Sequence, residues 1–552
     1  MRLLTRILLL IICCSLLKNS TVRAQNEILV YHAIVTDPQG KIIPWNHPDP
    51  GKAYDEIIHL VWNFWDTMRT DPNGLPYYMN HQVWRPDHND PRGIGGDQFQ
   101  MAMSSWQLLY AYNGNERVKE NMEFMAEYYF SHGFSRPTDA WADIPYPYNT
   151  LTYGGVYDGD MILGKNFTQP DKAGSFGLEL LNLYQMTAGG NYPRTTDRLY
   201  LETAIKIANT LAIHVQPGDA THSPLPFKVN AVTGEVGLLK ENGVNGKNNQ
   251  TSSYATNWGG TLELFLQLIQ LQKGNTRLYQ AAFDKILGWM KKYPIQNNKW
   301  GPFFEDVPGW SDTQINATTF ARFMMLHPQY FSDWQKEVKN IFTWVYKNLG
   351  NTSWKKYGVT VINEQTAYRV PGNSHTARQG STELEYAVLT GDSSWKENAI
   401  RQLNWATYMV DNDGKNRFPT DENWLTDGYG DYVRHYLRAM RAFPELAPSD
   451  ENHILSSTDV IQQADYFPLV NKTIDWDIKE MDPKKIILYY RCFSDTGTEY
   501  IRLIKKPGQI RLNEKSMAEA KAGNEGYRWT DMKTGGLLKI SRKNGNRVVI
   551  SF

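Results

Sequence analysis

The chain has 552 residues, and its 58 Lys and Arg balance 58 Asp and Glu, so its net charge is zero. That balance argues against a surface drawn by bulk charge to a polyanion, whether nucleic acid or anionic lipid, and leaves room only for a local basic pocket. Aromatic residues make up 13% of the chain, with 18 Trp and 32 Tyr. Such rings suit the flat faces of sugars, and they equally suit a large helical core.

Residues 1–24 are predicted to form a secretory signal peptide. Two arginines precede an apolar run over residues 7–17, which is too short to span a bilayer, and a polar stretch then ends at Ala24. Two of the three cysteines lie inside the apolar run behind Ile12, which is too large for a lipoprotein processing site. We therefore expect a periplasmic or secreted protein that retains Cys492 alone and has no disulfide.

Twelve segments between residues 51 and 443 have helical periodicity and alternate between two kinds. One kind is amphipathic with a charged face: Tyr54–Met68, Arg117–His132, Tyr200–Val215, Leu278–Lys292, Trp334–Leu349 and Trp395–Val410. The other kind is apolar nearly all round: Phe99–Tyr112, Ser175–Thr187, Gly260–Leu271, Ala317–Leu326, Thr382–Leu389 and Tyr432–Ala442. Because a helix that is apolar on every side must be buried, the alternation predicts a closed double ring, the (α/α)6 toroid. An open α-solenoid is the alternative, but its repeats would have near-constant length and short loops.

The links between these segments predict where a site lies. Short links with glycine follow several of the inner segments, as at Asn113-Gly114-Asn115. Long links lead into the N-terminal ends of the inner segments: 69–96, 133–171, 216–256, 293–315, 350–378 and 411–427. Since long loops without structure of their own are usually functional, we expect the site at the long-loop rim of the toroid.

From about residue 446 the pattern changes to that of strands. Five short β-type runs are Lys485–Phe493, Thr498–Lys505, Gln509–Leu512, Leu537–Ser541 and Arg547–Phe552. Asn544-Gly545, between the last two runs, suits a tight hairpin turn. The expected protein is mainly α, with a toroid domain over residues 25–445 and a small β-sandwich-like domain over residues 446–552 that braces it.

Four acids in or beside the long loops are the candidate catalytic residues: Asp97, Asp171, Glu305 and Asp427. Asp97 and Asp171 each stand near the start of an inner segment, so each is either a helix N-cap or a catalytic acid. Glu305 is flanked by aromatic residues, a setting in which desolvation raises the pKa of a carboxyl group.

The same loops supply candidate substrate-binding residues: His81, Trp84, Arg85, Asp160, Trp258, Trp310, Arg369, His375, Arg378 and Tyr429. Among these, Arg85, Arg369 and Arg378 could clamp the carboxylate of a uronic acid in a bidentate manner. Every long loop mixes acids with aromatic rings. Glycoside cleavage needs two carboxylates across the scissile bond, so the loops predict a glycoside hydrolase.

In architecture, and in loops such as Trp424-Leu-Thr-Asp427-Gly-Tyr429-Gly-Asp431, residues 50–443 resemble the (α/α)6 glycan-degrading enzymes of Bacteroidetes type. Unsaturated glucuronyl hydrolases and glucuronidases are the most similar group, although no motif is matched. The resemblance implies that aspartates at early inner-helix starts carry the chemistry, which favours Asp97, Asp160 and Asp171. It also implies a substrate derived from plant or host polysaccharide that contains uronic acid.

Two other functions fit these residues. A polysaccharide lyase would use a Tyr or His base beside an arginine that neutralises the uronate, and Asn80-His81 with Arg85, or His375 with Arg378, could serve. Toroid lyases usually carry a much larger β region than this chain. A glycan-binding protein without catalysis would need the aromatic rings but not the acids.

The sequence predicts no cofactor and no metal site. It has no phosphate-binding glycine loop beside a strand and no serine nucleophile elbow, and His81 and His88 on one loop lack the surroundings of a metal site. The expected partner is an oligo- or polysaccharide, with no nucleic acid and no membrane span. The oligomeric state cannot be deduced from the sequence.

Overall fold

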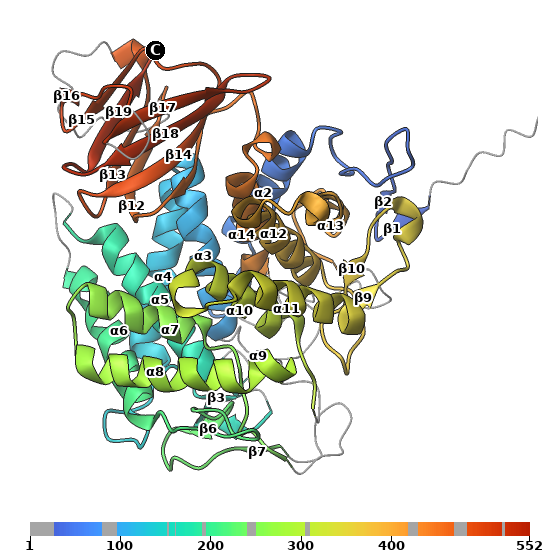
Figure 1. The fold of residues 1–552 in the computed structure, drawn as a ribbon. Helices are drawn as coiled ribbons and strands as arrows, with labels where there is room; N and C mark the ends of the chain where they lie inside the picture. Colours follow the sequence, from blue (N-terminus) through green and yellow to red (C-terminus); the bar gives the residue numbers. More distant parts are fainter. Residues whose placement is uncertain are drawn as a thin grey trace, which may run out of the picture.

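The computed structural model describes residues 27–79, 96–151, 154–160, 162–189, 195–239, 250–303, 310–417, 429–468, 483–520 and 525–552. These residues form a ring of helices with a β domain at one end (Figure 1). The predicted signal peptide lies outside them. No helix among the described residues is both long and apolar enough to cross a bilayer.

The helical ring closes on itself. Its outer helices are α2 (Pro50–Asp66), α4 (Glu116–His132), α6 (Thr195–His214), α8 (Thr276–Lys292), α11 (Trp334–Leu349) and α13 (Lys396–Thr407). Its inner helices are α3 (Gly96–Asn113), α5 (Pro170–Thr187), α7 (Gly259–Gln270), α10 (Gln314–Leu326), α12 (Asn373–Thr390) and α14 (Tyr429–Ala442). Each inner helix packs against the next, and α14 packs against α3. The predicted (α/α)6 toroid is therefore confirmed, and the open solenoid is excluded.

Two inner helices begin earlier than their periodicity predicts. α12 starts at Asn373 rather than near Thr382, and α5 starts at Pro170 rather than near Ser175. The added turns are polar, so their sequence lacks an apolar stripe, yet they are buried because their polar groups bond to neighbouring helices. As a result His375 and Arg378 lie on a helix, not in a loop.

Large aromatic side chains fill the space between the inner and outer helices. Trp106 of α3 contacts Trp62 and Trp65 of α2 edge to face, with ring centroids 4.9 and 5.6 Å apart. Trp65 also stacks on Tyr78 at 4.5 Å. Much of the high aromatic content is thus core rather than binding surface.

The β domain is a sandwich of two antiparallel sheets. One has the order β11 (His453–Ser457), β14 (Gly497–Leu503), β18 (Gly536–Arg542), β17 (Gly526–Asp531). The other has the order β12 (Ile461–Tyr466), β13 (Ile486–Cys492), β19 (Arg547–Ser551), β15 (Gln509–Leu512), β16 (Lys515–Ser516). Side chains of both sheets share one apolar core. The five predicted strand runs are confirmed, while β11, β12, β16 and β17 were not predicted.

The predicted hairpin at Asn544-Gly545 is wrong. β18 and β19, on either side of it, belong to different sheets, and each already has a partner strand on both edges. The backbone N–H of Gly545 donates to Asp495 instead, at 3.1 Å. The link therefore carries the chain from one sheet of the sandwich to the other.

The β domain docks on the short-link end of the toroid. The Tyr466 hydroxyl donates to the carbonyl of Ala111 near the end of α3 at 2.7 Å, and Gln462 Nε2 donates to the carbonyl of Gln185 near the end of α5 at 2.8 Å. In Figure 1 the long-loop strands β3 (Gly159–Asp160), β6 (Val229–Asn230) and β7 (Leu238–Leu239) lie at the opposite end. The β domain thus leaves the long-loop rim uncovered.

The remaining short elements lie mostly in the links and at the N-terminus. They are β1 (Ile28–Leu29), β2 (His32–Ala33), β4 (Gly164–Lys165), β5 (Phe167–Thr168), β8 (Gln250–Thr251), β9 (Gly350–Asn351), β10 (Val361–Ile362) and α9 (Pro294–Asn297).

Candidate functional site

Two adjoining cavities follow the axis of the toroid. The first, here called the axial cavity, has a volume of about 140 Å³; its wall includes Gln100, Ser175, Glu179, Asn257, Glu263, Phe303, Arg322, Arg434 and Arg438. The second, here called the seam chamber, has a volume of about 830 Å³ and lies between the inner helices and the β domain. Both are bordered by Ser104, Glu179, Glu263, Arg322 and Arg438.

The inner helices carry a charged stripe toward this axis, which corrects the expectation that they are apolar nearly all round. Glu179 lies on α5, Glu263 on α7, Arg322 on α10, and both Arg434 and Arg438 on α14. The stripe exists because the middle of the ring is a cavity and not packed core. Sequence reasoning missed these residues, although charge on an otherwise apolar helix was a usable signal.

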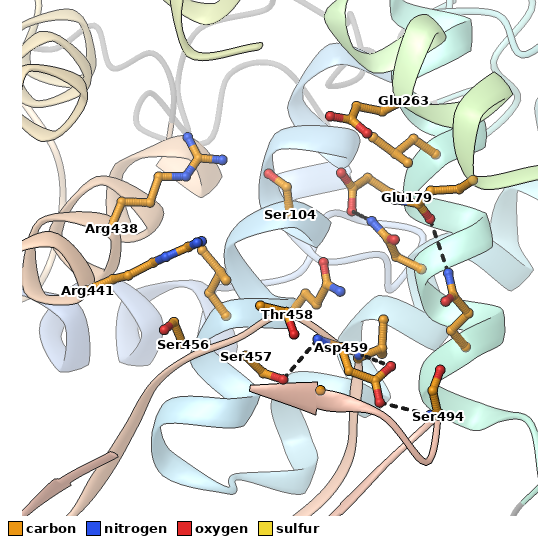
Figure 2. A pocket seen from close by; sticks show the side chains of 18 of the residues that line it. Ser104, Glu179, Glu263, Arg438, Arg441, Ser456, Ser457, Thr458, Asp459 and Ser494 are labelled. Carbon is orange, nitrogen blue, oxygen red and sulfur yellow. Dashed lines mark hydrogen bonds between the residues drawn. The ribbon is translucent and has the colours of Figure 1, made fainter. Parts of the chain in front are cut away.

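Glu179 is a buried acid without a cationic partner. Its side chain is 5% exposed and accepts one hydrogen bond, from Asn182 Nδ2 at 3.1 Å. Burial raises the pKa of Glu179 to about 7, although Asn182 and the charges of Arg434 and Arg438 act to lower it. In the described part of the chain it forms no ion pair. Figure 2 shows Glu179 and Glu263 on neighbouring helices, with Arg438 on the opposite wall.

Glu263 is held by a histidine. Its Oε1 lies 2.5 Å from Nε2 of His327, the C-cap residue that follows α10. The helices α5 and α7 approach each other closely near their N-terminal ends. There Gly174 packs on Thr261 and Gly260 packs on Ser175, and neither glycine has room for a Cβ atom. Glu179 and Glu263 both border the axial cavity from these two neighbouring helices.

At the starts of α12 and α14, Asp431 is surrounded by cations. It forms ion pairs with Arg378 and Arg434, accepts from Ser374, and lies 3.1 Å from His435 Nε2. Burial raises its pKa, but the two arginines outweigh burial and hold the pKa of Asp431 well below its usual range.

His375 and Arg378, both predicted to bind substrate, belong to this Asp431 cluster. Arg378 also donates to Gln314 Oε1 at 2.9 Å, so its guanidinium is engaged within the protein. Burial lowers the pKa of His375 well below the usual value, so the ring is neutral. The structure brings these residues together as one buried polar cluster and leaves Arg369 exposed on the preceding loop.

Asp171 is wholly buried one residue into α5, whose N-cap is Gln169. Its Oδ2 lies 3.2 Å from Lys172 Nζ and from Asn257 Nδ2. Its Oδ1 has no hydrogen-bond partner among the described residues. Asp171 is therefore not the N-cap, which removes one of the two interpretations the sequence left open.

Asp160 forms a second buried ion pair. Its carboxylate lies 3.0 Å from Lys228 Nζ, and it also accepts from Gln169 Nε2 at 2.7 Å and from the N–H groups of Ile162 and Leu163. Both oxygens are engaged within the protein. In this structure Asp160 joins the second and third long loops and lies away from the axial cavity.

The two predicted aromatic residues in the described loops differ. Trp258 is fully buried and donates Nε1 to the carbonyl of Ala255 at 2.7 Å, so its ring is part of the toroid wall. Trp310 is 40% exposed. Its ring lies edge to face with Tyr254 at 5.0 Å, and Lys299 Nζ lies 4.5 Å from its centroid.

The other predicted residues cannot be placed in the site. His81, Trp84, Arg85, Glu305 and Asp427 lie outside the described residues. Asp97 and Tyr429 lie in the first turns of α3 and α14, but their side chains are outside the described part. Within the described ranges, no three His, Cys, Asp or Glu are grouped to hold a metal ion.

No family model and no curated protein matches this chain. Solved structures do match. A cellobiose 2-epimerase from Spirochaeta thermophila is 13% identical with a TM-score of 0.50, covering 72% of this chain and 98% of its own. A D-mannose isomerase is 12% identical with a TM-score of 0.50, covering 73% and 99%. The cellobiose 2-epimerase from Bacillus thermoamylovorans is 13% identical with a TM-score of 0.50, covering 71% and 99%.

These similarities establish the fold. The predicted resemblance to (α/α)6 carbohydrate-processing enzymes is confirmed at that level. An unsaturated glucuronyl hydrolase specific for heparin also matches, at 8% identity and a TM-score of 0.39 over 72% of this chain and 99% of its own. That score is too low to carry an argument about activity.

Proposed function

We propose that this protein is a glycoside hydrolase for glycans that contain uronic acid, and that it cleaves them in the axial cavity. Glu179 is the observation that carries the proposal. A general acid must hold its proton at the working pH, and a buried carboxyl whose pKa is about 7 does so near neutrality. The fold, shared with enzymes named as sugar epimerases and isomerases, supports a saccharide substrate.

Glu263 is the second carboxylate that such a reaction requires. It borders the same cavity from the neighbouring helix, and His327 fixes its orientation. We assign Glu179 the role of general acid and Glu263 that of base or nucleophile. The separation of the two carboxyl groups then determines the outcome, with about 5–5.5 Å for retention and about 6.5–9.5 Å for inversion of the anomeric centre.

The arginines of the cavity support the uronic acid part of the proposal. Arg434 is paired with Asp431, and Arg322 is paired with Glu385 through bonds of 2.7 and 3.1 Å. Arg438 makes no hydrogen bond or ion pair within the described residues. A guanidinium group without a partner in the protein can bind a carboxylate of the substrate through two hydrogen bonds.

The acids predicted at the rim stay in the proposal as alternatives. Asp171 has one oxygen without a partner in the described ranges and lies beside Asn257, which borders the axial cavity. Asp97, Glu305 and Asp427 remain candidate catalytic acids, as the sequence predicts. If the rim is the catalytic centre, Glu179 acts only on substrate binding.

The test is a product assay on uronate-containing polysaccharides and aryl glucuronides. A hydrolase releases free sugar without ultraviolet absorbance from a new C4–C5 double bond. Glu179→Gln removes the proton donor and keeps the shape, so kcat should fall by about 100-fold or more. Glu202→Gln, on the exposed face of α6, is the matched control and should keep full activity. Full activity of Glu179→Gln would overturn the assignment.

A polysaccharide lyase is the second candidate, favoured by the unpaired Arg438 beside Arg434. Two guanidinium groups near a uronate carboxylate would also acidify its C5 proton, which a Tyr or His base must remove while the glycosidic C4–O bond breaks. The same assay separates the two reactions, because β-elimination creates the absorbing double bond and hydrolysis does not. Binding of the glycan without either product would point to a glycan-binding protein.

A further inference from the structure

The seam chamber is a second cavity that the proposed reaction does not use. It lies where the C-terminal halves of α3, α5, α7 and α14 face the turn between β11 and β12 and the turn between β13 and β14. Its volume of about 830 Å³ is within the range of ligand sites. Figure 2 shows Arg438 and Arg441 on one wall, Glu179 and Glu263 on another, and Ser456 to Asp459 along the β-domain side.

The lining of the chamber suits a ligand rich in hydroxyl groups. Amide side chains come from the helices, including Gln107, Gln267 and Gln270, and hydroxyl groups come from the β domain, including Ser457 and Ser494. Amides and hydroxyls each both donate and accept hydrogen bonds, which is the pattern that sugar hydroxyls require. A site for an apolar ligand would have few such groups.

The chamber is bordered by both acids and arginines, and they differ in how far they are engaged within the protein. Asp459 is engaged, because it accepts from the N–H groups of Val460 and Ser494 at 2.8 Å and lies 3.2 Å from Arg542. Within the described part of the chain, Arg438 and Arg441 make no hydrogen bond or ion pair. Of the other acids that border the chamber, Glu263 is held by His327, and Glu179 has only the amide of Asn182 as a partner among the described residues. Neither acid is paired with Arg438 or Arg441.

We propose that the seam chamber binds a sugar unit that carries a carboxylate or sulfate group, with Arg441 and Arg438 as its anion ligands. This inference deepens the proposed function and rests on it for the nature of the glycan. Since Glu179, Glu263 and Arg438 border both cavities, a unit in the chamber is continuous with one at the two carboxylates. The chamber is then the subsite for the next residue of the same glycan chain.

Arg441 allows a clean test because it borders the chamber and not the axial cavity. Calorimetric titration of the full chain would measure binding of D-glucuronate, glucose 6-sulfate and D-glucose. We expect at least one of the two anions, D-glucuronate or glucose 6-sulfate, to bind more tightly than glucose. Arg441→Gln should weaken binding of the preferred anion about tenfold and leave binding of glucose unchanged, since it removes a charge-assisted hydrogen bond. Arg441→Lys should retain part of the preference.

The control is Arg528→Gln, which removes the same charge from an exposed position on β17 and should bind the anion like the wild type. Thermal unfolding of both variants would verify that they fold. Equal affinity of wild type and Arg441→Gln for the anions, or glucose binding as tightly as they do, would overturn the chamber proposal.

The two proposals fail separately. If Glu179→Gln abolishes hydrolysis while Arg441→Gln binds glucuronate like the wild type, the chamber proposal falls and the catalytic assignment stands. If Glu179→Gln stays fully active while Arg441→Gln still loses anion binding, the catalytic assignment falls and the anion site stands.

Discussion

The long-loop rim and the middle of the axis bury their carboxylates in opposite ways. At the rim, Asp160 is paired with Lys228, Asp171 lies beside Lys172, and Asp431 is surrounded by arginines. On the axis, Glu179 has an amide but no cation at hydrogen-bond distance. Burial acts to raise the pKa of Asp160, Asp431 and Glu179, but the neighbouring cations outweigh burial at Asp160 and Asp431 and lower their pKa values. The acid of the proposed site therefore differs from the rim acids by its missing cation rather than by its burial.

Glu383 shows that a raised pKa does not by itself mark a site. Burial raises its pKa to about 8, and Gln379 donates to it at 2.8 Å. Glu383 lies on α12 but borders neither the axial cavity nor the seam chamber. Glu179 differs from it by facing space that a substrate can enter. A raised pKa and a position on a cavity wall are both needed to distinguish Glu179 from the other buried acids of the toroid.

The largest expected effect is on kcat, and it compares a variant on the axis with a variant at the rim. Glu179→Gln should lower kcat by about 100-fold to 10,000-fold, as expected for loss of a general acid. Asp171→Asn should lower kcat less, because it alters the mouth of the cavity and leaves the proton donor in place. Steady-state kinetics on the same substrate would compare them. A larger loss in Asp171→Asn would move the chemistry to the rim and reverse the comparison.

The next largest effect is on the free energy of unfolding. Here the variant at the rim should lose more than the variant on the axis. Asp431→Asn leaves Arg378 and Arg434 buried without their counter-ion, so it should cost about 3–5 kcal/mol of unfolding free energy. Glu179→Gln replaces a carboxyl that is neutral at low pH by an amide of the same shape, so its cost should be small. Denaturant unfolding would measure both. A large loss of stability in Glu179→Gln would mean that its carboxylate is structural, like that of Asp431.

Stability should also depend on pH differently at the two places. An unfolded glutamate loses its proton near pH 4.5, while folded Glu179 keeps it to about pH 7. Between those values the unfolded state binds fewer protons, so this group lowers stability as pH rises, by about 3 kcal/mol in total. Glu179→Gln should lack this loss. For Asp431, whose pKa is lowered, the stabilisation is instead lost as pH falls.

The ring was predictable because its signal is local and repeated. Helical periodicity and the difference between short and long links reveal the inner and outer helices without any knowledge of contacts. Asp160 could not be assigned in this way, since its partner Lys228 lies 68 residues further along the chain. Asn544-Gly545 misled for a related reason: a turn signal does not reveal which sheet each flanking strand joins.

The residues of the proposed site were only partly predictable. The rim candidates could be named because loops rich in acids and rings stand out in sequence, and they remain predictions. Glu179 and Arg438 were missed because they lie within segments that were interpreted as apolar nearly all round. On α14, Arg434, Arg438 and Arg441 follow a helical spacing that places charge on one face, and that pattern would have indicated a polar axis.

The smallest expected effect concerns the exposed ring at the rim. If the glycan passes the rim on its way to the axis, its sugar faces stack on Trp310. Trp310→Ala should then raise KM about fivefold, which corresponds to a stacking contribution of about 1 kcal/mol, and should leave kcat unchanged. Trp310→Phe, which keeps an aromatic face, should recover most of the loss. An unchanged KM in Trp310→Ala would mean that the substrate does not contact this part of the rim, and the seam between the toroid and the β domain would become the expected route to Glu179.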